Sequence, residues 1–237
     1  MQSITLRNVL CICVVALSIT GLAAASASAE PTWMMNKSNI AIGALPTFWH
    51  RAKNVLSLHT KIGGNSVLVE CFNLEALEGH FLTPKWFLWT LKGFECRVKI
   101  NGTENAACKP NPGAEPGVVL SNRLLGELTK HSTGEGVVLI KSTVEEVVAG
   151  VKQPVFGRIK SSVECPIGSN IPIIGPQFGA RDVGGNKSLE EEKVTHVGAQ
   201  GPLTEIWALS KTEEHKASTT GEVEMELASK EIWNGLL

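Results

Sequence analysis

The residues of this 237-residue chain that could do chemistry are its cysteines and its carboxylates. Four of the six cysteines lie beyond residue 30, at Cys71, Cys96, Cys108 and Cys165. Of the 23 acidic residues, Asp182 is the single aspartate, so the other 22 are glutamates. A pair of catalytic aspartates is therefore excluded, and aspartate-rich calcium loops are disfavoured.

Glutamates alone could support glycoside hydrolysis, which needs two carboxylates roughly 5–9 Å apart. The most closely grouped glutamates favour a solvated role instead. Glu222, Glu224 and Glu226 alternate with apolar residues as the outer face of a strand, and residues 190–192 follow Ser188 as a turn or short helix. No Gly-x-Ser-x-Gly motif marks a nucleophilic serine. We assign no catalytic residue and keep a secreted glutamate-dependent, glycosidase-like hydrolase as the alternative function.

Metal and nucleotide sites are not predicted. The six histidines are scattered without H-x-H or H-E-x-x-H spacing, and no C-x-x-C pair is present. Residues 179–188 are similar in composition to a phosphate-binding loop, but that motif would need glycines where Arg181 and Asn186 stand. We therefore expect no metal ligand, no cofactor-binding residue and no cofactor.

Tryptophan is the chain's most distinctive side chain, with six tryptophans and no tyrosine. Trp86 and Trp89 lie within the most apolar stretch, residues 81–91, and strand alternation would place them on opposite faces. An exposed tryptophan can stack on a sugar ring or anchor a protein partner. Trp86 and Trp89 are thus candidate ligand contacts, for a carbohydrate or an envelope protein, with core packing as the alternative.

The N-terminal residues predict export. Arg7 precedes an apolar run over residues 9–22, and the small residues that follow end in Ala27-Ser28-Ala29, an A-x-A cleavage site. Cleavage after Ala29 leaves 208 residues with no transmembrane anchor, secreted or on the exterior of the cell envelope. Only Arg7 is lost among charged residues, so 21 basic and 23 acidic side chains remain, a balance that gives no electrostatic footprint for nucleic acid.

Four cysteines in an oxidising compartment predict two disulfides. Three pairings are open. We favour Cys96–Cys108, because Asn101-Gly102 between them is a tight-turn sequence that folds the chain back, which leaves Cys71–Cys165.

Three stretches alternate between apolar and polar residues as half-buried strands do: residues 94–100, 155–165 and 221–227. In the first two, the cysteine lies on the apolar face, so the sulfur should point into a core. Many short strands, abundant turn residues and no βαβ rhythm predict an all-β fold. We expect an antiparallel β-sandwich or barrel of short strands, with at most one or two short helices.

Three parts of the chain are expected. Residues 1–29 form the signal peptide, residues 30–60 form an N-terminal segment packed on the domain, and residues 61–237 form the β domain. Trp33 and Trp49 in the N-terminal segment suggest that it packs rather than trails, and residues 47–56 could form a short helix.

A series of short stretches between about residues 55 and 185 carries a family resemblance: Leu58-His-Thr, Gly63-Gly64, Val69-Glu-Cys71, Lys92-Gly-Phe-Glu-Cys96, Cys108, Pro112-Gly-Ala-Glu-Pro-Gly117, Leu125-Gly-Glu-Leu128, Val163-Glu-Cys165 and Ile173-Ile-Gly175. With these stretches the chain resembles a family of uncharacterised exported bacterial proteins, in which a signal peptide precedes a cysteine-containing β domain. Thr129-Lys130-His131 departs from the likeness, because the family has an aromatic residue there. The resemblance implies export and a β fold, and no activity.

Together these observations favour an exported, non-enzymatic binding or structural module of the cell envelope or exterior. The sequence does not identify its ligand.

Overall fold

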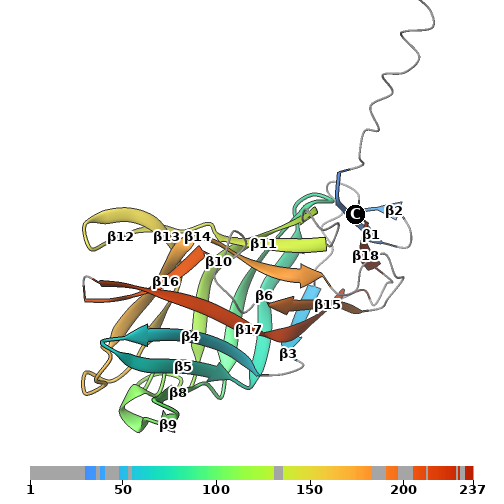
Figure 1. Ribbon diagram of the computed structural model, residues 1–237. Coiled ribbons are helices and arrows are strands. Elements are labelled where there is room, and N and C mark those ends of the chain that lie inside the picture. The colour runs from blue at the N-terminus through green and yellow to red at the C-terminus, as the bar shows by residue number, and fades with distance from the viewer. Residues whose placement is uncertain are drawn as a thin grey trace, which may run out of the picture. The chain divides into compact units, whose positions relative to one another are not determined.

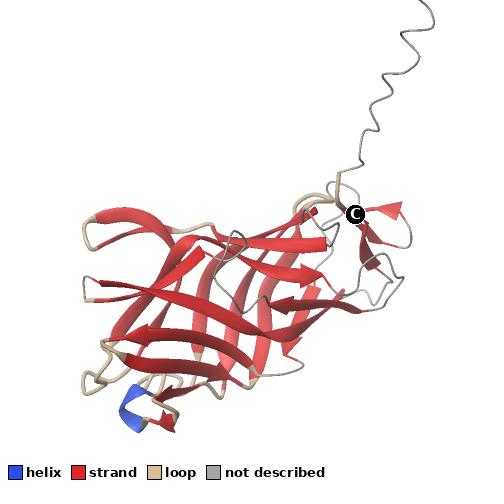
Figure 2. Cartoon of the chain, viewed as in Figure 1, coloured by secondary structure: helices blue, strands red, loops and turns tan. Residues whose placement is uncertain are grey.

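The structure is a computed structural model, and it describes residues 30–35, 38–40, 48–52, 55–130, 136–182, 191–196, 205–211, 213–227, 229 and 233–236. Within these ranges the chain forms strands joined by turns, and the one helix is a short 3-10 turn (Figure 2). The pairings between the described strands are antiparallel. The all-β prediction is therefore confirmed. The predicted signal peptide, with its cleavage site at Ala27 and Ala29, lies outside the described residues.

The elements follow in chain order. They are β1 (Thr32–Met35), β2 (Ser38–Asn39), β3 (Phe48–Ala52), β4 (Leu56–Ile62), β5 (Asn65–Cys71), β6 (Asn73–Phe81), β7 (Trp86–Phe94), β8 (Arg97–Ile100), β9 (Thr103–Glu104), η1 (Ala106–Cys108), β10 (Val119–Lys130), β11 (Gly136–Ser142), β12 (Glu145–Val148), β13 (Val151–Lys160), β14 (Asn170–Asp182), β15 (Glu191–His196), β16 (Glu205–Ser210), β17 (Glu213–Leu227) and β18 (Trp233–Leu236).

Most of these strands form a closed ring with eight wall positions (Figure 1). Some wall positions are made of two strands that follow one another along the chain, written here with a plus sign. In order around the ring, the positions are β3+β4, β5+β6, β7+β8, β10, β11+β13, β14, β15+β16 and β17. Each position pairs with the next, and β17 returns to pair with both β3 and β4. The described strands thus make an up-and-down antiparallel barrel, an architecture that removes the free sheet edges.

Neighbouring positions run in opposite directions, so the connections alternate between two ends of the barrel. The disulfide end carries the Gly63-Gly64 turn, the 101–118 connection, the 161–169 loop and the turn at Lys211. The opposite end carries the 82–85 turn, which Trp86 follows, and we call it the tryptophan end. It lies beside a small sheet of β18, β1 and β2. Each end is filled by its own apolar cluster.

Trp33 links the small sheet to the barrel. Its side chain is fully buried, and its ring makes edge-on contacts with Phe81 (6.1 Å between centroids) and Phe87 (5.8 Å). Its backbone N–H donates to the carbonyl of Pro84 in the turn between β6 and β7. Residues 30–60 therefore contribute Trp33 to the core and β3 and most of β4 to the barrel wall.

The predicted turn at Asn101-Gly102 is confirmed. Both residues have positive φ, 51° and 84°, and Ile100 pairs with Thr103 across them, as in a two-residue hairpin. The strand predicted over residues 94–100 is interrupted, because Glu95 also has positive φ, 52°, and separates β7 from β8. The alternation survives the break, and Cys96 remains buried.

Three local predictions are wrong. Residues 48–52 form β3 rather than a helix, because closure of the barrel pairs them with β17. The strand predicted over 155–165 ends at Lys160, and a loop follows in which Val163 is 89% exposed. Residues 191 and 192, predicted as a turn or helix, begin β15. Residues 48–52 and 191–192 form strands because a distant strand pairs with them, and residues 161–165 do not because no strand pairs with them there. In each case the long-range pairing outweighs the local pattern.

Candidate functional site

The first disulfide joins Cys71 to Cys96 and staples two neighbouring wall positions. Glu70 pairs with Arg97 on one side of it and Asn73 with Phe94 on the other, so the two cysteines are directly opposite in the same register. Their Cα atoms are 4.0 Å apart, and both side chains are buried.

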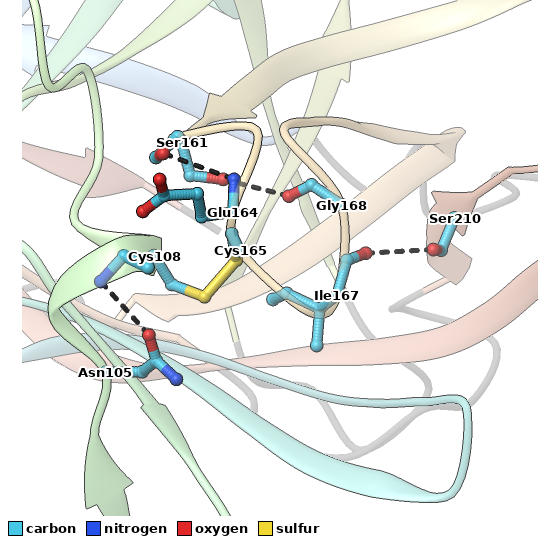
Figure 3. Close-up of a disulfide and its surroundings, with 10 residues drawn as sticks. Asn105, Cys108, Ser161, Glu164, Cys165, Ile167, Gly168 and Ser210 are labelled. Atoms are coloured by element: carbon cyan, nitrogen blue, oxygen red, sulfur yellow. Dashed lines mark hydrogen bonds between the residues drawn. A yellow bond between two sulfur atoms is a disulfide. The ribbon is translucent and has the colours of Figure 1, made fainter.

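The second disulfide joins Cys108 to Cys165 and ties together the two loops that cover the disulfide end (Figure 3). Cys108 closes the single turn of η1, where its N–H donates to the Asn105 carbonyl at 3.0 Å. The loop that holds Cys165 is anchored by Ser210, whose hydroxyl donates to the Ile167 carbonyl at 3.0 Å.

The favoured pairing of Cys96 with Cys108 is therefore wrong, as is its complement, Cys71 with Cys165. After the Asn101-Gly102 turn, the returning strand ends at Glu104 and the chain enters η1. Cys108 is thereby carried away from the face of Cys96. The prediction that all four cysteines form disulfides is confirmed, and so is the burial predicted for Cys96 and Cys165.

A cavity of about 140 Å³ lies inside the ring of strands. Its lining is drawn from both apolar clusters and from most of the wall positions. Six of the apolar side chains that line it are Leu58, Val69, Leu124, Phe156, Ile173 and Ile206. An eight-stranded barrel encloses just enough room for side chains or one small ligand, and here the side chains do not fill it.

Small residues form part of the cavity wall. Gly93 on β7, Gly157 on β13 and Thr219 on β17 all line the cavity. A Cβ on Gly93 would lie 2.9 Å from Cys71 Sγ, so the first disulfide excludes any larger residue there. Cys71 of this disulfide thus forms part of the cavity wall, and the bridge joins two of its strands.

Few polar atoms reach the lining. The Ser121 hydroxyl is engaged, since it accepts from the Leu91 N–H at 2.8 Å and donates to the Asn122 carbonyl at 2.7 Å. Thr219 differs: its Oγ1 is buried and has no hydrogen-bond partner among the residues that the structure describes. A buried hydroxyl of this kind is a group for which an explanation should be sought.

The cavity approaches the surface where β10 meets β13. These strands share one register pair, Ser121 with Gly157, and the pairing of β10 with β7 shifts between Leu120 and Arg123. Leu120 lines the cavity and is 50% exposed. This is the part of the cavity wall with the fewest register pairs among the described strands.

The two candidate tryptophans have different environments. Trp89 is 2% exposed and stacks on Phe87 with 4.7 Å between ring centroids, so it belongs to the core and cannot meet a ligand at the surface. Trp86 is 41% exposed, at the start of β7 beside the 82–85 turn. The structure therefore does not bring the two together, and neither lines the cavity.

Two glutamates, Glu127 and Glu146, have a lowered pKa, and each is bound by cationic side chains on the outside of the barrel. Partial burial raises the pKa of Glu127, but hydrogen bonds and charge attraction from Lys141 (3.1 Å) and Lys85 (3.3 Å) outweigh it, so the pKa lies below its ordinary value of 4.5. The hydrogen bond from Arg158, 3.0 Å from Nε to Oε2, lowers the pKa of Glu146.

These carboxylates do not resemble the pair of a glycoside hydrolase. Its general acid needs a raised pKa, whereas both of these are lowered. No glutamate is among the described residues that line the cavity. In the described part of the chain, no three His, Cys, Asp or Glu side chains are grouped so that they could hold a metal ion. The described residues also contain no helix of sufficient length and apolarity to span a bilayer.

The residues that sequence reasoning missed are those that line the cavity, such as Leu124, Phe156 and Ile206. No local signal in the sequence shows this space, because its lining comes from strands that only closure of the ring brings together.

Comparisons of the chain with protein-family models, with curated proteins and with solved structures found no match. The cavity and the disulfides are therefore the observations on which a functional proposal rests.

Proposed function

We propose that this protein is an exported, non-enzymatic binding module that holds a small apolar ligand inside its barrel. The observation that carries the proposal is the cavity of about 140 Å³, lined by side chains such as Leu124, Phe156 and Ile206. Transfer of an apolar molecule from water to such a lining is favourable by roughly 25 cal/mol per Å² of buried surface.

Export is supported by the signal sequence and by the resemblance to exported bacterial proteins. The disulfides agree with it, since two buried bridges are typical of a protein that matures in an oxidising compartment. They also serve the binding role. Cys71 of the first bridge lines the cavity, and Cys108–Cys165 holds the loops over one end of the barrel. A preformed cavity binds better than one that must be ordered by its ligand.

We place the ligand's entry at the loosely paired stretch around Leu120 and Gly157. Both ends of the barrel are filled by apolar clusters. Entry through the side of the barrel requires only that β10 separate locally from β13. This separation breaks a single register pair, Ser121 with Gly157.

Calorimetric titration of the oxidised protein with benzene tests the proposal. We expect a dissociation constant on the order of 1 mM or tighter, together with a negative heat-capacity change from apolar burial. Val119→Phe fills part of the cavity from its wall and should weaken binding at least fivefold. Val163→Phe is the matched control, because the same substitution there falls on an exposed loop and should leave binding unchanged.

Two results would contradict the proposal. One is no detectable benzene binding by the folded, oxidised protein. The other is undiminished binding by Val119→Phe when its melting temperature shows that it is folded. Binding at a surface site would give the second result.

A further inference from the structure

We infer that the side chain of Asn122 is a latch across the entry to the cavity, and that it sets how fast an apolar ligand enters and leaves. The inference rests on the proposed function, since it concerns the regulation of the same cavity. Asn122 is not among the described residues that line the cavity. Its role is therefore in access to the cavity and not in contact with the bound ligand.

The backbone alone holds this entry weakly. Among the described strands, β10 and β13 share one register pair, Ser121 with Gly157, whereas β10 pairs with β11 over residues 124–130. The two strands nevertheless approach closely, because a Cβ on Gly157 would lie 3.0 Å from the Leu120 carbonyl oxygen. Side chains must therefore supply the hydrogen bonds that a longer ladder would provide.

The amide of Asn122 supplies this connection. Its Nδ2 donates to the Val155 carbonyl of β13 at 2.7 Å and to Glu146 Oε1 of β12 at 3.2 Å. Both partners are acceptors, so the amide group uses both of its N–H hydrogens. The side chain is half-buried, which makes the loss of either bond more costly than it would be in water. One residue of β10 thus fastens that strand to both strands of the β12–β13 hairpin.

The two acceptors are themselves held on the far side of the entry. The Val155 carbonyl also accepts from the Ser142 hydroxyl at 2.6 Å. Glu146 Oε2 accepts from Arg158 Nε at 3.0 Å, and Arg158 lines the cavity next to Gly157. These bonds keep Val155 and Glu146 in place when β10 moves away from β13. Opening of the entry must therefore break both bonds from Asn122.

The exchange of fluorobenzene, followed by fluorine NMR, tests the inference in the oxidised wild-type protein and in Asn122→Ala. The substitution removes the latch and leaves the cavity lining in place. We expect the release rate to rise about fivefold, the factor that one net hydrogen bond provides. The dissociation constant should stay within twofold of the wild-type value, because entry and release accelerate together. Asn122→Ser is too short to span both acceptors and gives the same test if the alanine variant does not fold.

Asn65→Ala is the matched control. Asn65 Oδ1 accepts from the Asn101 amide at 2.8 Å, and neither residue lies on a strand that borders the entry. Its release rate should stay within twofold of wild type. Amide hydrogen exchange of the ligand-free protein gives a second measurement. The amides of β13 around Gly157 should exchange faster in Asn122→Ala, while those of β4 and β5 should not change.

A release rate in Asn122→Ala within twofold of wild type would overturn this inference and leave the proposed function standing, because fluorobenzene would still bind. Equal acceleration in Asn65→Ala would also overturn it, since the effect would then come from a general loss of stability. Failure of the wild-type protein to bind fluorobenzene would overturn the proposed function itself, and the inference with it.

Discussion

Cys71 and Cys96 lie directly opposite one another in one antiparallel register, with their Cα atoms 4.0 Å apart. The register continues through the bend where β5 gives way to β6 and β7 to β8, and the Phe72 N–H donates to the Phe94 carbonyl beside the bridge. The disulfide therefore spans the point where both strands change direction. It joins the two wall positions where β5 and β8 end and β6 and β7 begin.

The disulfide pairing can be checked directly. Peptide mapping of the unreduced protein should find Cys71 linked to Cys96 and Cys108 linked to Cys165. Linkage of Cys96 to Cys108 would contradict the barrel register.

Loss of either bridge should also lower stability. On the loop-entropy model, the sequence separations of 25 and 57 residues correspond to about 3.5 and about 4.2 kcal/mol respectively. Urea unfolding of Cys71→Ala/Cys96→Ala and of Cys108→Ala/Cys165→Ala measures both. Equal stability of the wild type with and without reductant would contradict the expectation, provided that the thiols are shown to be free.

The two tryptophans of β7 should respond differently to truncation. Trp89→Ala removes a buried ring that stacks on Phe87 and should cost about 3–5 kcal/mol. Trp86→Ala removes a ring that is 41% exposed, and we expect a loss of less than about 1 kcal/mol. Denaturant unfolding of the two variants gives the comparison, and similar losses would argue against the strand phase seen here.

The acid dependence of stability should include a contribution from Glu127. Its pKa is lower in the folded protein than the ordinary value of 4.5, so the contribution is complete above that value and is lost as the pH falls through the folded pKa. Glu127→Gln should therefore reduce stability at pH 7 by on the order of 1 kcal/mol. The difference from wild type should shrink as the pH approaches 3.

An exposed loop glutamate gives the matched control for that series. Glu164→Gln should change stability by less than about 0.5 kcal/mol across the same pH range. A Glu127→Gln effect that did not depend on pH would show that its two lysine partners contribute packing rather than charge pairing.

Thr219 should carry a stability cost when no ligand is bound. A buried hydroxyl without a partner costs roughly 1–3 kcal/mol relative to an apolar group of the same shape. Thr219→Val should therefore raise the stability of the ligand-free protein by about 1 kcal/mol, measured as a higher melting temperature. A stability loss would indicate that the hydroxyl already has a partner in the folded protein.

The sequence predicted the features that depend on neighbouring residues. Asn101-Gly102 tolerates positive φ and formed the expected turn, and Cys96 followed its apolar neighbours into the core. Trp86 and Trp89 fell on opposite faces for the same reason. In each case the period-two geometry of a strand is sufficient, and no distant residue has to be known.

Features that depend on distant strands were not predictable in this way. The partner of Cys96 is set by the register of β8 against β5, and residues 48–52 became a strand because β17 closes the ring. Val163 faces solvent because its strand ends at Lys160, where the chain must cross the barrel end. The cavity could not be predicted locally either, because its lining residues come from strands that only ring closure brings together.

A crystal structure of the protein under xenon pressure would show whether the closed barrel holds an empty apolar cavity. Xenon enters apolar cavities of this size and scatters strongly. We predict one dominant xenon peak inside the ring of strands, in contact with Leu124, Phe156 and Ile173 and close to Thr219. The account would be contradicted by a barrel interior filled by side chains with no xenon peak, or by strands that do not close into a ring.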